Sequence, residues 1–192
     1  TQATLVPSED LIEILEADGF LNVGLFARGV DTELFDPARR SAELRRSWGA
    51  DEDTPVAIYV GRLAGEKNLP LTVEAFEAFR RERPDAKLVL VGDGPSRKAL
   101  ERDHPEYIYA GMRRGEELAT HFASGDVFLF ASTTETFGNV VTEGMASGVV
   151  VLAYDYAAPK KHIRSGENGY TVPLNDREAF LEAAARVARE RD

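Results

Sequence analysis

The sequence predicts an α/β fold, in which helices cover both faces of a Rossmann-like, doubly wound parallel sheet. Six short apolar runs alternate with amphipathic helical patterns, which is typical of this class. The hydrophobic fraction of 43% and the charged fraction of 29% are ordinary for a globular protein, and they exclude disordered and fibrous classes. A chain of 192 residues is long enough to bury a full core, so we expect one domain with a short appendage.

The alternation begins after residue 55 and continues to the end of the chain. The runs expected to form strands are Val56–Val60, Lys87–Val91, Tyr107–Ala110, Val127–Phe130, Val149–Ala153 and Tyr170–Val172. The expected helices are Leu69–Arg83, Ser96–Arg102, Gly115–Ala123, Asn139–Ser147 and Asp176–Arg189. In the first of these helices, Leu69, Val73, Phe76 and Phe79 recur at spacings of four and three, which predicts one apolar stripe against the sheet.

The first 55 residues follow a different pattern. They predict a strand at Thr4–Val6, a helix at Ser8–Ala17 that Ser8 can cap, a strand at Val23–Phe26 and a helix at Pro37–Trp48. The chain starts with Thr1, inside an element, as a piece of a longer protein would. We therefore expect residues 1–28 to be a junction with a missing amino-terminal domain, and residues 29–192 to form one ligand-binding domain.

Charge and composition exclude several functions. With 33 acidic and 23 basic side chains the net charge is -10, which argues against a nucleic-acid partner and leaves any bound anion to a few local cations. The absence of cysteine excludes disulfides, thiol catalysis and thiolate metal sites, and three scattered histidines argue against a zinc site. No apolar run is long enough to cross a membrane. Asp51-Glu52-Asp53 precedes its strand and predicts a solvated turn.

Ligands of an open parallel sheet lie beyond the carboxyl ends of its strands, so the following loops hold the candidate site. The loop Gly61–Asn68 carries Arg62 and Lys67, which could bind a diphosphate in so acidic a chain. They could equally be solvated cations, one of them paired with Glu66.

The next loop, Gly92-Asp93-Gly94-Pro95, has two glycines that would let the backbone approach a ligand closely, although a plain strand-to-helix turn explains them equally well. Arg97 replaces the third glycine of Gly-x-Gly-x-x-Gly, which argues against a nicotinamide dinucleotide site.

The segment after Phe130 is the most informative. Glu135 lies in the loop, and Gly138 and Asn139 open a helix whose free amides and dipole attract anions. Glu143 follows one turn later, so both carboxylates could contact one ligand, although Glu135 could instead cap the helix.

The loop Tyr154–His162 has two aromatic side chains and three potential cations. His162 could orient a sugar or a phosphate, or be merely exposed. We expect His104 and His121 to be exposed.

Together these loops resemble the carboxyl-terminal domain of the retaining GT-B glycosyltransferases of group 1, family 4. The motifs that carry the resemblance are Val6-Pro7-Ser8, Arg28–Phe35 (RGVDTELF), Gly61–Asn68 (GRLAGEKN), the Glu-x7-Glu pair and Glu167-Asn168-Gly169. The replacement of the usual Gly-Gly and glutamate by Tyr154–Ala158 with Lys161-His162 is similar to the branch of bacterial GDP-mannose-dependent mannosyltransferases.

The resemblance implies a role for each candidate residue. Arg62 and Lys67 would bind and stabilise the leaving diphosphate, Glu135 would contact the donor sugar, and these three form the expected catalytic group. Glu143 would hold the ribose hydroxyls, and the nucleobase would lie near Gly92–Gly94 and Gly111-Met112. The full set expected to bind the donor is Gly61, Arg62, Lys67, Gly92, Gly94, Met112, Phe137, Gly138, Asn139, Val140 and Glu143.

The resemblance also implies the activity. We expect retaining transfer of a hexosyl group, mannosyl or another, from GDP-mannose or a UDP-sugar to an acceptor held by the missing amino-terminal domain, with no metal and no other cofactor. The isolated chain is then expected to bind donor but to transfer it poorly. The parent enzyme is expected in the cytoplasm, with membrane contact only through its acceptor. The alternatives are a non-catalytic nucleotide-sugar-binding module and a nucleotide-sugar epimerase of GT-B architecture. The Glu-x7-Glu pair argues against the epimerase.

Overall fold

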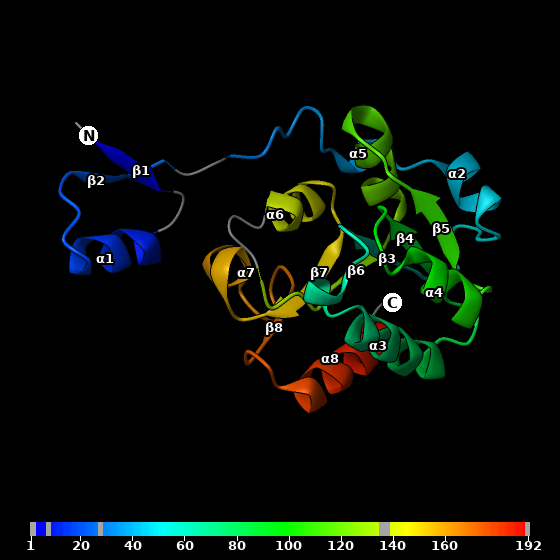
Figure 1. Ribbon diagram of the computed structural model, residues 1–192. Helices are drawn as coiled ribbons and strands as arrows, with labels where there is room; N and C mark the ends of the chain where they lie inside the picture. Colours follow the sequence, from blue (N-terminus) through cyan, green and yellow to red (C-terminus); the bar gives the residue numbers. More distant parts are fainter. Residues whose placement is uncertain (1–2, 7–8, 27–28, 135–138, 191–192) are drawn as a thin grey trace.

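The computed structural model describes residues 3–6, 9–26, 29–134 and 139–190 (Figure 1). Its strands are β1 (Thr4–Val6), β2 (Val23–Leu25), β3 (Val56–Val60), β4 (Lys87–Val91), β5 (Ile108–Gly111), β6 (Val127–Phe130), β7 (Val150–Tyr154) and β8 (Tyr170–Val172). Its α-helices are α1 (Glu9–Ala17), α2 (Ala42–Ser47), α3 (Leu69–Glu82), α4 (Arg97–Asp103), α5 (Gly115–Ser124), α6 (Asn139–Ala146), α7 (Ala157–His162) and α8 (Arg177–Glu190). Two short 3₁₀ helices, η1 (Pro37–Arg39) and η2 (Gly65–Lys67), precede α2 and α3.

Six strands form one parallel sheet in the order β5-β4-β3-β6-β7-β8. The chain starts at the centre with β3, winds outward through β4 to β5, and then returns to the other side of β3 as β6. This is the doubly wound order, and it confirms the predicted fold class. The order reverses between β3 and β6, so the loops that follow these two strands flank the topological switch point.

Each face of the sheet has its own core. Along β3, Ala57 and Tyr59 belong to the core on the side of α3 and α8, whereas Val56, Ile58 and Val60 belong to the core on the other side. Figure 1 shows α3 and α8 side by side on one face and α5 and α6 on the other. Strands buried on both faces read as continuous apolar runs, which explains why the sequence located them so well.

The apolar stripe predicted for α3 is confirmed. Leu69, Phe76 and Phe79 are buried against the sheet and α8, and Val73 is partly buried beside them. The Phe76 ring also meets the Tyr107 ring edge to face, with centroids 5.4 Å apart. The predicted stripe therefore forms the contact between this helix and the core.

The helix predicted over Pro37–Trp48 is wrong as a single element, because η1 and α2 replace it. Ser41 lies between them in an extended conformation, and its hydroxyl accepts a hydrogen bond from the backbone of Leu44 over 3.1 Å. The residue therefore acts as an N-cap, which ends one helical turn and starts the next.

A buried ion pair fastens this region to the sheet. Arg45 is only 1% exposed, and its guanidinium donates to the carboxylate of Asp126 and to four carbonyl oxygens. Asp126 precedes β6 and also accepts from Arg40 over 3.0 Å and from the backbone of Val56 over 2.7 Å. We call these three side chains, Arg40, Arg45 and Asp126, the Asp126 clamp. Charges buried this deeply are stable only when paired so fully.

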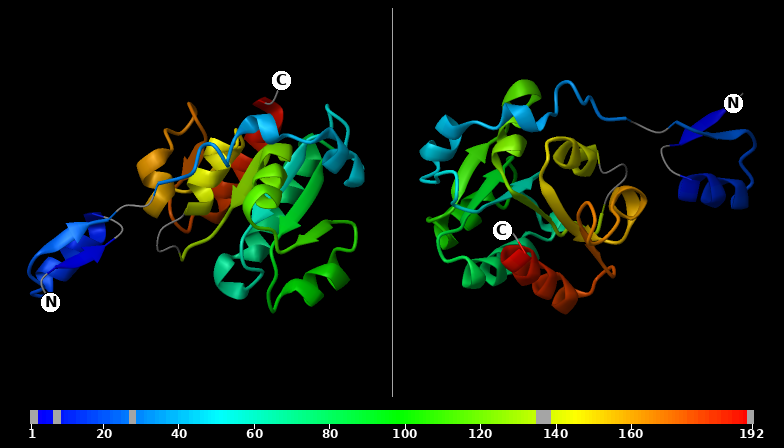
Figure 2. Two further views of the ribbon diagram at one scale, coloured as in Figure 1. Left: turned by 90° about the horizontal axis from the view of Figure 1, so that it is seen from above. Right: turned by 180° about the vertical axis from the view of Figure 1, so that it is seen from behind.

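The first elements form a separate small unit. Strands β1 and β2 pair in parallel, and α1 packs on them. Figures 1 and 2 show this unit apart from the six-stranded sheet in all three views. Its large apolar side chains are unusually exposed, and they are Leu5, Ile14, Phe20, Leu21, Leu25 and Phe26.

Candidate functional site

The loops that follow β3 and β6 meet at the switch point, at the carboxyl edge of the sheet. The ammonium group of Lys67, from the first loop, donates to the carbonyl oxygen of Thr134, from the second, over 3.0 Å. The hydroxyl of Thr134 donates in return to the carbonyl oxygen of Glu66 over 3.1 Å. The structure therefore joins two segments that lie 67 residues apart in the sequence.

The two predicted anion-binding cations lie in the first loop. Lys67 ends η2 and is partly buried, whereas the Arg62 side chain is 65% exposed. Arg62 pairs with Glu66 over 3.4 Å, as one of the alternative interpretations predicts. An exposed pair of this kind is weak, so the guanidinium can exchange Glu66 for a phosphate at little cost.

The glycines after β4 allow a close approach of backbones within the protein. A Cβ on Gly92 would lie 1.9 Å from the carbonyl oxygen of Gly61, and one on Gly94 would lie 2.4 Å from that of Leu63. The amide of Leu63 also donates to the carbonyl oxygen of Asp93 over 2.9 Å. The two glycines therefore pack the β4 loop under the loop that carries the cations.

The loop after β5 continues this arrangement. The amide of Gly92 donates to the carbonyl oxygen of Gly111 over 2.9 Å, and Gly111 has a φ of +72°, which favours glycine. Met112 follows and is exposed, with its sulfur 3.6 Å from Arg114 Nη2. The three loops after β3, β4 and β5 thus form one continuous edge, which ends in an exposed apolar side chain.

Helix α6 contributes Glu143 from the other side of the switch point. Glu143 is half-buried, and within the described part of the chain no group donates a hydrogen bond to its carboxylate. This burial raises the pKa of Glu143 above its ordinary value. A ligand hydroxyl that donated to the carboxylate would offset the cost of its burial.

The remaining candidates of this segment divide into two groups. Asn139 and Val140 form the first turn of α6 and are partly buried. Glu135, Phe137 and Gly138 lie outside the described residues, so the predicted contact of Glu135 with a ligand stays a prediction.

The segment after β7 corrects the sequence analysis. The residues interpreted as a loop include α7, whose first turn contains Pro159, a position that proline tolerates. Ala157 begins this helix with a φ of +52°, unusual for a residue with a side chain. Tyr154 is buried against Phe180, so it serves the core. His162 is exposed, and partial desolvation with the nearby charge of Lys161 lowers its pKa.

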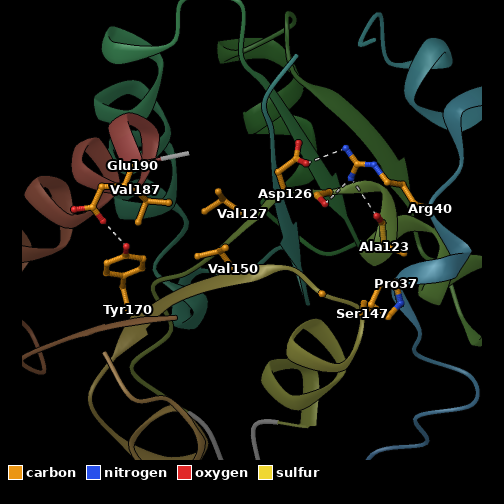
Figure 3. Close-up of a pocket in the computed structure, with 12 residues that line it drawn as sticks. Pro37, Arg40, Ala123, Asp126, Val127, Ser147, Val150, Tyr170, Val187 and Glu190 are labelled. Atoms are coloured by element: carbon orange, nitrogen blue, oxygen red, sulfur yellow. Dashed lines mark hydrogen bonds and ion pairs between the residues drawn. The ribbon is translucent and has the colours of Figure 1, made fainter. Parts of the chain in front are cut away.

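A hollow lies at the opposite, amino-terminal edge of the sheet (Figure 3). It has a volume of about 320 Å³, and Val127, Val150 and Val187 form its apolar floor. The charged groups on its rim already have partners, because Arg40 binds Asp126 and Tyr170 binds Glu190. This hollow therefore has little polar capacity left for a ligand.

Within residues 3–6, 9–26, 29–134 and 139–190, no three or more His, Asp or Glu side chains are grouped so that they could hold a metal ion. No helix in this part of the chain is long and apolar enough to span a bilayer.

Comparison with known proteins decides the family. The family model described as glycosyl transferases group 1 matches residues 54–190. A GDP-mannose-dependent alpha-mannosyltransferase of Mycobacterium tuberculosis is 40% identical over 98% of this chain, and one of Corynebacterium glutamicum is 39% identical over 96%. The chain belongs to the group 1 glycosyltransferases. It spans about half the length of these relatives, namely 48% and 43%.

Solved structures of glycosyltransferases share the fold of this domain. HepE from Anabaena, in complex with UDP and glucose, superposes with a TM-score of 0.81 at 18% identity, over 99% of this chain and 54% of its own. The sucrose-phosphate synthase of Thermosynechococcus elongatus gives 0.77 at 24% identity, over 97% and 49%. At these identities the likeness shows the fold alone. The predicted fold class and the predicted family are confirmed.

Proposed function

We propose that the chain is the donor-binding domain of a retaining glycosyltransferase and binds a nucleotide-diphosphate sugar at the carboxyl edge of its sheet. One observation carries this proposal. The loop with Arg62 and Lys67 meets the segment that leads to α6 and Glu143 at the switch point of a group 1 glycosyltransferase domain. The two cations on one side suit a diphosphate. On the other side the half-buried carboxylate of Glu143, to which no group in the described residues donates, suits the hydroxyls of the same ligand.

Each side chain has a chemical part in this proposal. Arg62 and Lys67 bind the diphosphate and stabilise the negative charge that grows on it as the glycosidic bond breaks. Glu143 accepts hydrogen bonds from the ribose hydroxyls, and Glu135 contacts the donor sugar near the anomeric carbon, where positive charge develops. The amides of Phe137–Val140 add fixed dipoles. We propose that this set acts without a metal or another cofactor.

We propose GDP-mannose as the donor. Two relatives that are 39–40% identical over almost the whole chain are GDP-mannose-dependent alpha-mannosyltransferases. The segment after β7, with Tyr156, Lys161 and His162, is similar to this branch. A UDP-sugar is the alternative, and nucleotide binding distinguishes the two.

We further propose that residues 1–28 connect the donor domain, residues 29–192, to an amino-terminal domain that holds the acceptor. The relatives are about twice as long as this chain, which leaves room for such a domain. The exposed apolar side chains of β1, α1 and β2, with Leu21 82% exposed, are a surface that it could cover. We propose that the parent enzyme is cytoplasmic and contacts membranes only through its acceptor.

Calorimetric titration of the chain with GDP, UDP and ADP tests the donor site. We expect GDP to bind with a Kd between about 1 µM and 1 mM, more tightly than the other two. Glu143→Ala and Arg62→Ala should each weaken GDP binding by about tenfold or more, because each removes a charged hydrogen-bond partner. Arg46→Ala is a matched control. Arg46 is exposed on α2, and its neighbour Arg45 binds Asp126 at the amino-terminal edge of the sheet, opposite the edge that carries these loops.

The outcomes separate the parts of the proposal. Tighter binding of UDP would keep the donor site and overturn the choice of GDP. Equal binding by the wild-type, Arg62→Ala and Glu143→Ala chains would refute the site. A nucleotide-sugar-binding module without catalysis is the second candidate, and joining the chain to an acceptor domain distinguishes it, because only an enzyme would then transfer sugar.

A further inference from the structure

Thr134 occupies a particular place at the switch point, because it binds two consecutive residues of η2. Its hydroxyl donates to the carbonyl oxygen of Glu66 over 3.1 Å, and its carbonyl oxygen accepts from the ammonium of Lys67 over 3.0 Å. The two hydrogen bonds run in opposite directions between the two loops. A change in the position of Thr134 therefore shifts both the backbone and the ammonium of η2.

The buried side chain of Ser132 fixes the orientation of the Thr134 backbone. Ser132 is only 1% exposed, and its hydroxyl donates to the carbonyl oxygen of Thr134 over 3.3 Å. The same hydroxyl accepts from the amide of Thr134 over 3.4 Å. A buried, close-packed side chain thus supports the carbonyl group that Lys67 binds, although Thr134 itself is exposed.

Such support matters for a lysine more than for most cations. A lysine side chain has four rotatable carbon–carbon bonds, and ordering it on binding costs affinity. The Lys67 ammonium reaches across the switch point to the carbonyl oxygen of Thr134, which holds the side chain in one extended position. One of the three ammonium donors binds the Thr134 carbonyl, and this hydrogen bond sets where the positive charge lies at the switch point.

We propose that Thr134 is a positioning residue, which holds the ammonium of Lys67 in place before the diphosphate of the donor arrives. This inference rests on the proposed donor site, and it names a residue outside the expected site. Thr134 acts through its hydroxyl bond to Glu66, which keeps η2 close enough for Lys67 to reach the Thr134 carbonyl.

The variants Thr134→Val and Thr134→Ser test the role of the hydroxyl. Valine keeps the size of threonine without the donor, and serine keeps the donor. Because Thr134 is exposed, neither change removes core packing. Thermal unfolding and amide spectra of both variants should match those of the wild type.

The first measurement needs no nucleotide. The side-chain ammonium of Lys67 should give a proton–nitrogen NMR signal at low temperature, because its hydrogen bond slows exchange with water. Lys67→Ala assigns this signal among the five lysines, and the exposed Lys160 and Lys161 serve as internal references. We expect the signal in the wild type and in Thr134→Ser, and its loss in Thr134→Val.

The second measurement is a double-mutant cycle on GDP affinity. Thr134→Val should weaken GDP binding by about 2- to 10-fold, as the loss of one hydrogen bond does, and should leave guanosine binding unchanged. Thr134→Ser should bind GDP like the wild type. In a Lys67→Ala chain, Thr134→Val should have no further effect, because the group that it positions is absent.

Two results would overturn this role of Thr134. One is an unchanged Lys67 signal in Thr134→Val, and the other is an equal loss of GDP affinity with and without Lys67. If the wild-type chain bound no nucleotide, the proposed donor site would be refuted. The NMR signal of Lys67 would then still support or refute the positioning of its ammonium by Thr134.

Discussion

Replacing Gly92 by alanine should destabilise the protein severely. Gly92 has a φ of +141°, a conformation that residues with a side chain rarely adopt. Its new Cβ would lie 1.9 Å from the carbonyl oxygen and 2.9 Å from the carbonyl carbon of Gly61. Both are backbone atoms next to β3, so no side chain can rotate away to make room.

The cost has two parts. An ordinary contact begins at 3.4 Å, so the β3 and β4 loops would have to separate by about 1.5 Å. Forced separation of packed elements costs about 1–3 kcal/mol, and the backbone strain at Gly92 costs about 1–3 kcal/mol more. Together these give an expected loss of roughly 2–6 kcal/mol from a free energy of unfolding that is on the order of 5–15 kcal/mol.

Urea unfolding of Gly92→Ala and the wild type measures this loss. Gly115→Ala is the matched control, because Gly115 also has a positive φ of +54° but has no atom within 4 Å of its Cβ position. The control should lose only about 1–2 kcal/mol from the left-handed backbone. If Gly92→Ala were no less stable than Gly115→Ala, the close approach of the two loops would be refuted.

Two further predictions concern stability away from the site. His121 is buried beside the Trp48 ring, and this burial lowers its pKa below the ordinary 6.5. As the pH falls, the unfolded chain therefore binds a proton at this histidine before the folded chain does. The free energy of unfolding should decrease as the pH drops through about 6.5. Unfolding curves of the wild type and His121→Gln at pH 5.5 and 7.5 check this, since the variant should lose that part of the pH dependence. Asp126→Asn should cost about 3–5 kcal/mol in urea unfolding, because it leaves the buried Arg45 without its countercharge. Glu52→Gln, at the exposed end of the contact with Arg40, should cost less than about 1 kcal/mol, and equal losses in the two variants would contradict the importance of burial.

The sequence predicted the sheet well because its strands are buried on both faces. Val56–Val60, Lys87–Val91 and Val127–Phe130 have the predicted bounds. The strand predicted from Tyr107 starts one residue later, at Ile108, because the amide of Tyr107 donates to the carbonyl oxygen of His104 in the preceding turn over 3.2 Å. The Tyr107 side chain belongs to the contact with α3, where its hydroxyl donates to Glu77 over 2.7 Å. Apolar content alone does not distinguish a strand residue from a core residue beside it.

The elements that were missed depend on local signals weaker than apolar periodicity. Ser41 interrupts the helix predicted over Pro37–Trp48, and only its capping geometry reveals the break. Pro159 is compatible with the start of α7, since proline is tolerated in the first helical turn but not in a helix interior. His121 was expected to be exposed, but it is on the buried face of α5, where Trp48 packs against it from a distant part of the sequence.

The candidate site was predictable as a set of loops, but not in its internal contacts. The rule that ligands lie past the carboxyl ends of parallel strands located Arg62, Lys67 and Glu143. The strand order decides which loops touch, and this order cannot be read from the periodicity of the sequence. The contact of Gly92 with Gly61 and that of Thr134 with Lys67 both depend on it.

The Asp126 clamp has a mechanical consequence. Two arginines from the segment before β3 grip one carboxylate, and that carboxylate also holds the first amide of β3. A force that pulled on the chain before Arg40 would therefore act on the buried, charged hydrogen bonds of the clamp, at the amino-terminal edge of the sheet. The loops with Arg62, Lys67 and Thr134 lie at the opposite edge, a full strand length away. We expect the clamp to act as an anchor, so that tension from the amino-terminal side dissipates before it can distort the candidate site.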